Sequence, residues 1–263
     1  MSGEYPLYDN LLNVCKTRMS VRNLKPDPLP PGHVEKIVEA GRWAMSGANS
    51  QPWEFIIVTQ PDIKQELWDA YVSINCEYTF WMEQMRLPEL RHPSFHMPGS
   101  AEEQLARYKS FTGWSQVPAL IVVLGDGRKQ WGTVMGGHTF GRGMSHLTDG
   151  LANACQIMHL AAAALGLGTQ WVTIHVQEPF KRILGIPDLI MLHTIIPVGY
   201  PNVERREGIR RNLSELVHYE TYDRDKYLSD KQIVEYLTAL RKKTVPKYRA
   251  SRQVQKEDQE GGN

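Results

Sequence analysis

Hydrophobic residues in this 263-residue chain recur at two spacings, and each spacing predicts a different element. Apolar residues three and four positions apart, the spacing of an amphipathic helix, run through residues 7–17, 31–45 and 61–71. Residues 147–165 are apolar almost all round, which predicts a helix buried in a core or at a subunit interface.

Short apolar runs bounded by turn residues predict strands instead. Four such runs occur, at 54–59, 119–124, 169–174 and 191–198. The strands alternate with the helices and make a small sheet, and no internal repeat is present.

Charge and composition argue against several classes of protein. Thirty basic residues against 29 acidic ones leave no field to attract nucleic acid or an acidic membrane surface. Hydrophobic residues make up 41% of the chain, but no run of 18 or more apolar residues exists and the N-terminus has no signal pattern. We therefore expect a soluble cytoplasmic protein without nucleic-acid or membrane partners.

Cysteine and histidine spacing argues against a metal site. Cys15, Cys76 and Cys155 lie far apart without a CxxC pair, which speaks against zinc and disulfide scaffolds and fits a reducing compartment. Two histidines at positions 92 and 96 have helical spacing, but Pro93 between them disfavours the helix that would place both on one face. No bound metal is expected.

Arg18, Ser20 and Arg22 are the first candidates for ligand binding. Two guanidinium groups and a hydroxyl within about one turn of backbone suit a phosphate. The competing interpretation is a pair of surface arginines that cap carbonyls or pair with acids.

A loop of small and polar residues, 46–51, leads into the first strand. Because few side chains stand in the way, its backbone amides can approach a flat ligand closely. Two glycine-containing segments have plainer interpretations. Gly166-Leu167-Gly168 is a helix stop. Residues 136–143, either a phosphate cradle or a mobile loop, lack the lysine and Ser/Thr of a Walker motif, which favours the loop.

In this order and spacing, the arginine motif and the small-residue loop resemble the FMN-dependent nitroreductase family. That family includes the iodotyrosine deiodinases and the flavin-cleaving dimethylbenzimidazole synthases. The resemblance covers roughly residues 8–218, apart from a poorly matching stretch at about 71–115. Its second half rests on four further blocks: 166–174 (GLGTQWVTI), 184–187 (LGIP), 196–201 (IPVGYP) and 210–213 (RRNL).

The resemblance implies an α+β nitroreductase-like fold, with a small mixed or antiparallel sheet flanked by helices in an intertwined homodimer. It also implies FMN as the cofactor, with Arg18, Ser20 and Arg22 at its phosphate and at the pyrimidine side of its ring. Either Arg210 or Arg211, of which Arg211 is better aligned, is expected to reach the same phosphate.

Two further groups of residues follow from the resemblance. The loop that covers the flavin from the other subunit in relatives corresponds to Ser46, Gly47, Ala48 and Asn49. Thr173 aligns where relatives place a hydroxyl or carboxyl group beside flavin N5, and the Ile174 amide lies next to it. Thr173 is thus the expected catalytic residue, although a threonine alone is also a typical strand residue.

Residues 71–115 correspond to the family's substrate-determining lid and are rich in aromatic side chains and methionine. Such side chains can stack on an aromatic substrate or simply pack the lid. The candidate substrate contacts are Tyr78, Trp81, Tyr108 and Phe111. The deiodinases hold an amino acid with a lid glutamate, tyrosine and lysine. Glu77 and Lys109 lie in the corresponding region, with Tyr78 and Tyr108, but no register supports a specific deiodinase assignment.

The leading hypothesis is a homodimeric FMN oxidoreductase that passes electrons from NADH or NADPH, by a ping-pong mechanism, to a nitroaromatic, a quinone or a halogenated phenol. An oxygen-dependent flavin-fragmenting enzyme is disfavoured, because Ser20 stands where the dimethylbenzimidazole synthases carry an aspartate. A non-catalytic flavin-binding module is the third alternative. One domain is expected over 1–250, followed by a disordered tail at 251–263.

Overall fold

The chain folds into two units in the computed structural model, which describes residues 5–88, 91, 99–109, 113–129, 142–204 and 207–243. The first unit comprises Met1–Tyr78 and Lys109–Glu207, and the second comprises Thr79–Tyr108 and Gly208–Asn263. The single domain predicted over 1–250 stays a prediction, and the tail at 251–263 lies outside the described residues.

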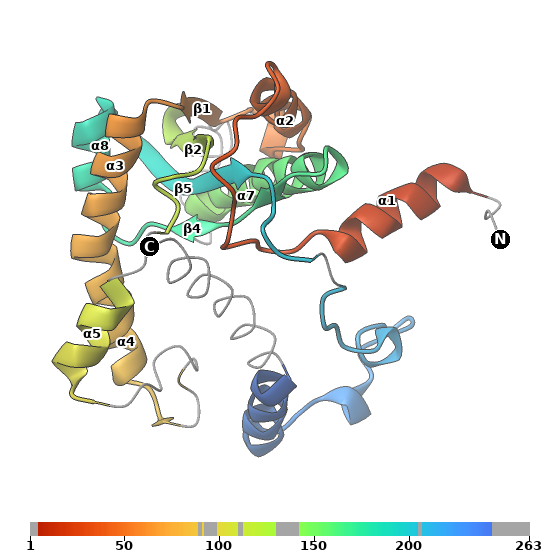
Figure 1. The fold of residues 1–263 in the computed structure, drawn as a ribbon. Coiled ribbons are helices and arrows are strands. Elements are labelled where there is room, and N and C mark those ends of the chain that lie inside the picture. Colours follow the sequence, from red (N-terminus) through yellow and green to blue (C-terminus); the bar gives the residue numbers. More distant parts are fainter. Residues whose placement is uncertain are drawn as a thin grey trace. The chain divides into compact units, whose positions relative to one another are not determined.

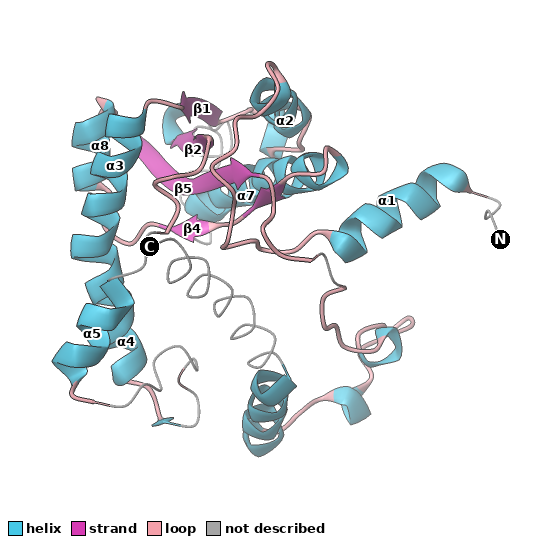
Figure 2. Ribbon diagram, in the orientation of Figure 1, coloured by secondary structure: helices cyan, strands magenta, loops and turns pink. Residues whose placement is uncertain are grey.

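A five-stranded sheet forms the centre of the first unit (Figures 1 and 2). Its strands are β1 Trp53–Val58, β2 Ala119–Asp126, β3 Gly168–Thr169, β4 Val172–Thr173 and β5 Ile190–Gly199. The order is β1-β2-β5-β3, and β4 also pairs with β5. All four ladders are antiparallel, so the α+β prediction is confirmed with an antiparallel sheet.

Helices cover both faces of the sheet, and every residue of β2 is buried. The odd-numbered residues 119–123 of β2 pack with α2 (His33–Arg42) and α7 (Arg142–Ala164). The even-numbered residues 120–124 face the opposite side, where α3 (Pro61–Ala70) and α8 (Glu178–Leu184) lie side by side (Figure 1). A strand covered on both faces needs a continuous apolar run, and β2 supplies one.

Helix α7 packs closely on α2 and ends sharply. Gly41 of α2 permits the close approach, because a Cβ there would lie 2.5 Å from Cγ of Met158. At the other end Gly166 has a φ of +83°, which glycine adopts easily, and the Leu167 N–H donates to the Ala162 carbonyl at 2.8 Å. The predicted helix stop is confirmed.

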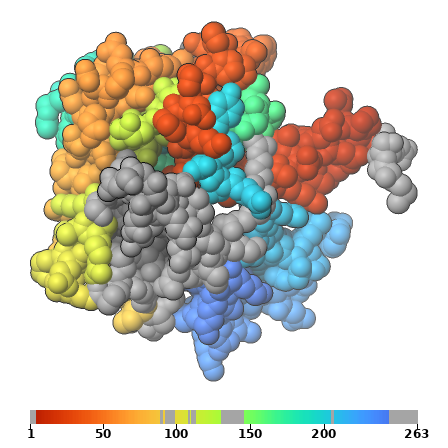
Figure 3. Space-filling model, in the orientation of Figure 1, coloured from red at the N-terminus to blue at the C-terminus, as the bar shows by residue number. Residues whose placement is uncertain are grey.

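Helix α1 (Pro6–Thr17) carries an apolar face that is largely exposed in the part of the chain that the structure describes. None of its residues is buried, and Leu7 and Leu11 are 86% and 56% exposed. In the space-filling view the helix, drawn in red, has much of its surface uncovered (Figure 3). Amphipathic spacing therefore predicted the helix correctly, but its apolar face has no core to pack against.

A helical rod continues α3 through a π-helical segment, Tyr71–Cys76, into α4, Glu77–Gln84. The rod is anchored where Trp68, Tyr71 and Trp114 pack with ring centroids 5.2 to 5.6 Å apart. The π segment has a wider turn than an α-helix and often marks a functional position.

The second unit contains most of α4, all of α5 (Ala101–Lys109) except Lys109, and the C-terminal part of the chain. That C-terminal part holds two short 3-10 helices, Leu213–Glu215 and Arg224–Lys226, and a helix at residues 230–243. The last helix was not predicted from the sequence.

Three predicted elements are corrected by the structure. The helix expected over 31–45 covers only His33–Arg42, because Gly32 precedes it with a φ of +79°. The strand expected over 119–124 extends to Asp126, since its ladders with β1 and β5 continue. The strand expected over 169–174 is divided into β3 and β4, since the two residues between them leave the sheet.

Candidate functional site

The arginine motif, residues 18–22, is fixed against β3. Ser20 forms a parallel bridge with Thr169, and the Val21 N–H donates to the Thr169 carbonyl at 2.8 Å. The Val21 side chain is 3% exposed and packs on Gly168, where a Cβ would lie 3.0 Å from it. Alternate side chains of extended backbone point to opposite sides, so Val21 anchors the motif while the polar residues on either side of it remain exposed.

A buried histidine of α7 supports this contact. The Nδ1 atom of His159 lies 2.7 Å from the Thr169 Oγ1. Burial, together with the positive charge of Arg18, lowers the pKa of His159 to about 4. The imidazole is therefore neutral near pH 7, and it supports Thr169 without adding a second positive charge beside Arg18.

Thr173 is the last residue of β4, and its side chain is exposed. It pairs with Thr194 of β5, whose hydroxyl donates to the Val172 carbonyl at 2.8 Å. Thr173 is exposed, whereas Ile174 after it is buried. The Thr173 hydroxyl can therefore meet a ligand, while its neighbours fix the backbone.

Strand β5 sets the spacing between the motif and Thr173. Thr169 pairs with Val198 and Thr173 pairs with Thr194. Positions four residues apart on an antiparallel strand are separated by roughly 13 Å. An elongated ligand can therefore place an anionic end at the arginine motif and a flat ring near Thr173.

The small-residue loop has an unusual backbone. Ala48, Asn49 and Gln51 have φ values of +52°, +51° and +45°. These values lie in the left-handed region, which residues other than glycine rarely adopt. The Ser46 hydroxyl accepts a hydrogen bond from the Gln51 N–H at 2.9 Å. The Asn153 side chain of α7 donates to the Met45 carbonyl, just before the loop, at 3.3 Å. These bonds hold a conformation that would otherwise be costly.

One chain does not bring this loop to the arginine motif. Ser46 packs against α7 at Gly150, where an added Cβ atom would lie 3.4 Å from the Cβ atom of Ser46. Thr169 contacts α7 at His159, which is roughly 13 Å further along at the rise of an α-helix. The two parts of the predicted cofactor site therefore lie at different heights on α7.

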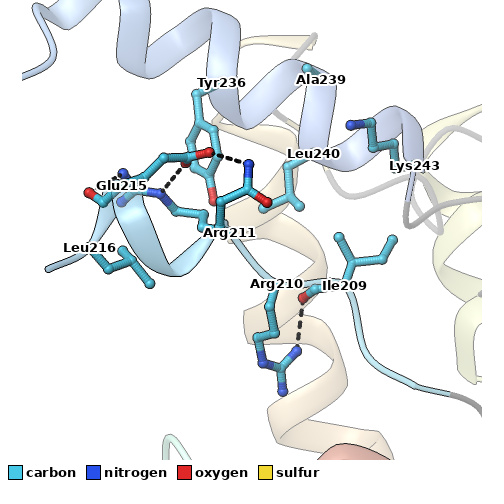
Figure 4. A pocket seen from close by; sticks show the side chains of 10 residues that line it. Ile209, Arg210, Arg211, Glu215, Leu216, Tyr236, Ala239, Leu240 and Lys243 are labelled. Carbon is cyan, nitrogen blue, oxygen red and sulfur yellow. Dashed lines mark hydrogen bonds and ion pairs between the residues drawn. The ribbon is translucent and has the colours of Figure 1, made fainter. Parts of the chain in front are cut away.

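Arg210 and Arg211 belong to the second unit, where they line a cavity of about 550 Å³ (Figure 4). The Arg211 Nε donates to Glu215 Oε2 at 3.2 Å, and its guanidinium lies 5.6 Å from the centroid of the Tyr236 ring. The Arg210 guanidinium donates only to the Ile209 carbonyl at 2.8 Å among the described residues. Arg211 is thus engaged by an acid, while Arg210 forms no ion pair in the described part of the second unit.

The predicted substrate residues are divided among different parts of the chain. Tyr78 lies in the first unit, with its ring 4.6 Å from that of His175, and remains 47% exposed. Trp81 lies in the second unit and is 45% exposed. The Tyr108 side chain and all of Phe111 lie outside the described residues.

Glu77 and Lys109 form an ion pair within the first unit. Both are partly exposed, and the pair joins the beginning of α4 to the end of α5. The sequence placed both residues in the lid region but did not predict that they meet.

Two polar residues near Thr173 and the motif were missed as candidates. Asn75 accepts hydrogen bonds from the backbone N–H groups of His175 and Val176, and His159 supports Thr169. In the sequence the only signal was a polar residue inside an otherwise apolar helical pattern. Such a residue is usually buried only when it has hydrogen-bond partners, and both of these have them.

The described residues contain no group of three or more His, Cys, Asp or Glu side chains that could hold a metal ion. Among the same residues, none of the helices combines the length and the apolar character needed to cross a bilayer. Cys15, Cys76 and Cys155 are all free thiols.

Sequence comparison connects this geometry to known proteins. Residues 15–200 match the family model described as "Nitroreductase family". A relative named NADH dehydrogenase, from Thermus thermophilus, is 25% identical over 82% of this chain and 98% of its own length. A relative named iodotyrosine deiodinase, from Thermotoga neapolitana, is 24% identical over 81% of this chain and 98% of its own length.

Solved structures show the same fold. An iodotyrosine deiodinase crystallised with FMN and 3-iodo-L-tyrosine matches with a TM-score of 0.56 at 22% identity. The match covers 81% of this chain and 100% of that one. At this level of identity the similarity is one of fold.

Proposed function

Because the chain belongs to the nitroreductase family, we propose that it is an FMN-dependent oxidoreductase that takes electrons from NADH or NADPH. It passes them, in a second half-reaction, to a small aromatic acceptor such as a nitroaromatic, a quinone or a halogenated phenol.

One observation carries the proposal: Ser20 pairs with Thr169. This contact joins the N-terminal arginine motif to the strand segment that leads to Thr173. Residues that are far apart in the sequence thereby become the two ends of one elongated surface. Without the contact, the phosphate and ring candidates would be unrelated.

The residues present fit FMN at both ends. Arg18 and Arg22 provide positive charge and Ser20 an exposed hydroxyl, which suit a phosphate and the polar edge of a flavin. Thr173 places a hydroxyl, and Ile174 a backbone amide, where a ring nitrogen would accept a hydrogen bond. The spacing of roughly 13 Å along β5 is one that a ribityl chain and part of the ring can cover.

The protein's contribution is to bind, orient and donate. FMN, when bound, supplies the ability to store electrons between the two half-reactions. Arg18, Ser20 and Arg22 hold its anionic end, and the neutral His159 keeps Thr169 and therefore Ser20 in place. The Thr173 hydroxyl holds a proton at the position proposed for flavin N5, which adjusts how readily the ring is reduced.

Three features support the proposed homodimer. The loop 46–49 is separated from the arginine motif by roughly 13 Å of α7, so a second copy is needed to cover the flavin with it. The apolar face of α1 is exposed, as expected of a surface that another chain covers. Finally, β1 is an edge strand, and a groove of about 410 Å³ lies between it and α2.

Flavin fragmentation remains the alternative reaction within the family. It is disfavoured because the arginine motif offers the hydroxyl of Ser20 rather than a carboxylate. A non-catalytic flavin-binding module is disfavoured because Thr173 is exposed at the proposed ring position rather than buried in the strand.

The test begins with the purified protein. It should be yellow with an FMN spectrum, and NADH or NADPH added without oxygen should bleach it. Nitroaromatic, quinone and iodophenol acceptors should then restore the colour at measurable rates. Including 3-iodotyrosine beside 4-iodophenol asks whether Glu77 and Lys109 serve an amino-acid substrate. Protein that stays yellow with both nicotinamides, or takes up no FMN, contradicts the proposal.

A further inference from the structure

Asn75 is a polar side chain placed in the core of the first unit by the π-helical segment. It is 0% exposed, and Cys76 after it is 4% exposed. The segment interrupts the rod formed by α3 and α4. A buried amide needs hydrogen-bond partners, so its surroundings decide what it does.

Those partners lie just beyond Thr173, where the chain leaves the sheet. β4 ends at Thr173, so the backbone N–H groups that follow have no strand to pair with. The Oδ1 atom of Asn75 accepts from the His175 N–H at 2.6 Å and from the Val176 N–H at 3.4 Å. One side chain thus replaces the strand partner that these two groups lack.

The orientation of the Asn75 amide is determined by these contacts. The reverse orientation would turn its NH₂ group toward two N–H donors and leave all three without an acceptor. In the present orientation only Nδ2 lacks a partner among the described residues.

The segment that carries Thr173 is therefore held on both sides. The ladder with β5 fixes Val172 and Thr173, and Asn75 fixes the N–H groups of His175 and Val176. Because each peptide unit is planar, holding the His175 N–H also sets the direction of the Ile174 carbonyl. We propose that Asn75 is a positioning residue that orients the Thr173–Ile174 backbone toward the flavin ring, an inference that rests on the function proposed above.

Two substitutions separate the acceptor from the packing. Asn75→Leu keeps the branched shape of the side chain, with a somewhat larger volume, but removes the acceptor, whereas Asn75→Asp keeps an oxygen that accepts from the same two N–H groups. Cys76→Ala serves as the control, because it loosens the same π segment without touching the hydrogen bonds. The experiment loads each variant with FMN and measures its rate of reduction by NADPH without oxygen, together with the flavin midpoint potential.

We expect Asn75→Leu at full FMN occupancy to be reduced about tenfold more slowly, with a shifted potential. Asn75→Asp should recover to within about threefold of the wild type, and Cys76→Ala should match it. An unchanged rate and potential in Asn75→Leu overturn the positioning role. Equal defects in Asn75→Leu and Cys76→Ala also overturn it, because the loss is then one of packing. A wild-type chain that takes up no FMN, or is not reduced, overturns the proposed function itself.

Discussion

His159 lies with its Nδ1 atom 2.7 Å from the Thr169 hydroxyl, beneath the strand that binds the arginine motif. The contact connects the middle of the sequence to its beginning, because Thr169 pairs with Ser20. A side chain that never reaches the surface thus helps to set the geometry of an exposed cationic motif.

This contact predicts a pH dependence of stability. The pKa of His159 is lowered from 6.5 to about 4 in the folded chain, so the unfolded chain binds the proton more tightly. The contribution of His159 to the free energy of unfolding should therefore be fully present above pH 6.5. It should be lost as the pH falls toward 4, by on the order of 3 kcal/mol. Denaturant unfolding at several pH values measures this loss. His159→Gln keeps a polar partner for Thr169 but has no imidazole to titrate, so its unfolding free energy should fall less steeply between pH 6.5 and 4. The same pH dependence in the variant and the wild type would contradict the prediction.

The arginine motif should govern the affinity for FMN. Arg18→Ala or Arg22→Ala removes a charge-assisted contact of about 1.5–3 kcal/mol, which weakens binding roughly ten- to a hundredfold. Titration of the apoprotein with FMN, followed by flavin fluorescence, measures the change. Arg182→Ala, at an exposed arginine of α8, is the matched control and should bind as the wild type does. Full affinity in both motif variants would show that the phosphate binds elsewhere.

Replacing Arg210 and replacing Arg211 should weaken FMN binding to different extents. The family resemblance favours Arg211 at the phosphate, but Arg211 already contacts Glu215 whereas Arg210 forms no ion pair among the described residues. We expect Arg210→Ala to weaken FMN binding about tenfold and Arg211→Ala to do so by less. The same titration decides between them, and a larger loss in Arg211→Ala would restore the order expected from the sequence.

Thr173 should tune reduction rather than binding. Replacing it with alanine removes one hydrogen bond of about 0.5–1.5 kcal/mol, so turnover should fall about tenfold at most while FMN occupancy is kept. The midpoint potential of the bound flavin, measured by anaerobic dye titration, should shift. Thr173→Ser retains the hydroxyl and should keep the wild-type potential. If the alanine variant keeps it too, the ring contact comes from a backbone amide such as that of Ile174.

The proposed dimer can be tested by complementation. If the loop of one chain covers the flavin held by the other, Arg18→Ala and Asn49→Ala damage opposite halves of one site. Mixing and re-forming the two impaired variants creates heterodimers with one intact site, which is measured at an FMN concentration too low to fill the damaged sites. Activity should then return to about a quarter of the wild-type level at random exchange. No recovery, with exchange shown by mass spectrometry, would place the loop and the motif of the same chain in one site.

The sequence predicted most elements because local patterns determine them. The continuous apolar run of β2 and the helical spacing of α1 and α3 were sufficient. The division of β3 from β4, and the pairing of Glu77 with Lys109, depend on contacts between distant segments that no local pattern records. Asn75 was missed for the same reason, since its partners follow a different strand. The apolar face of α1 was predicted from the spacing of its residues, but no local pattern indicates that Leu7 and Leu11 stay exposed in the folded chain.

The π-helical segment at Tyr71–Cys76 also limits how this family member can change. Deleting one residue there would restore a regular α-helix and leave α4 with nearly its present rotation about the helix axis, because a π turn holds about one residue more than an α turn. Asn75 would still lose its place in the wide turn, and with it the two N–H groups from which it accepts. A deletion in this segment therefore removes the contact behind Thr173 even where the helix itself is kept. Insertions and deletions should instead accumulate in the connections outside this rod, and that is where the lids of close relatives are expected to diverge.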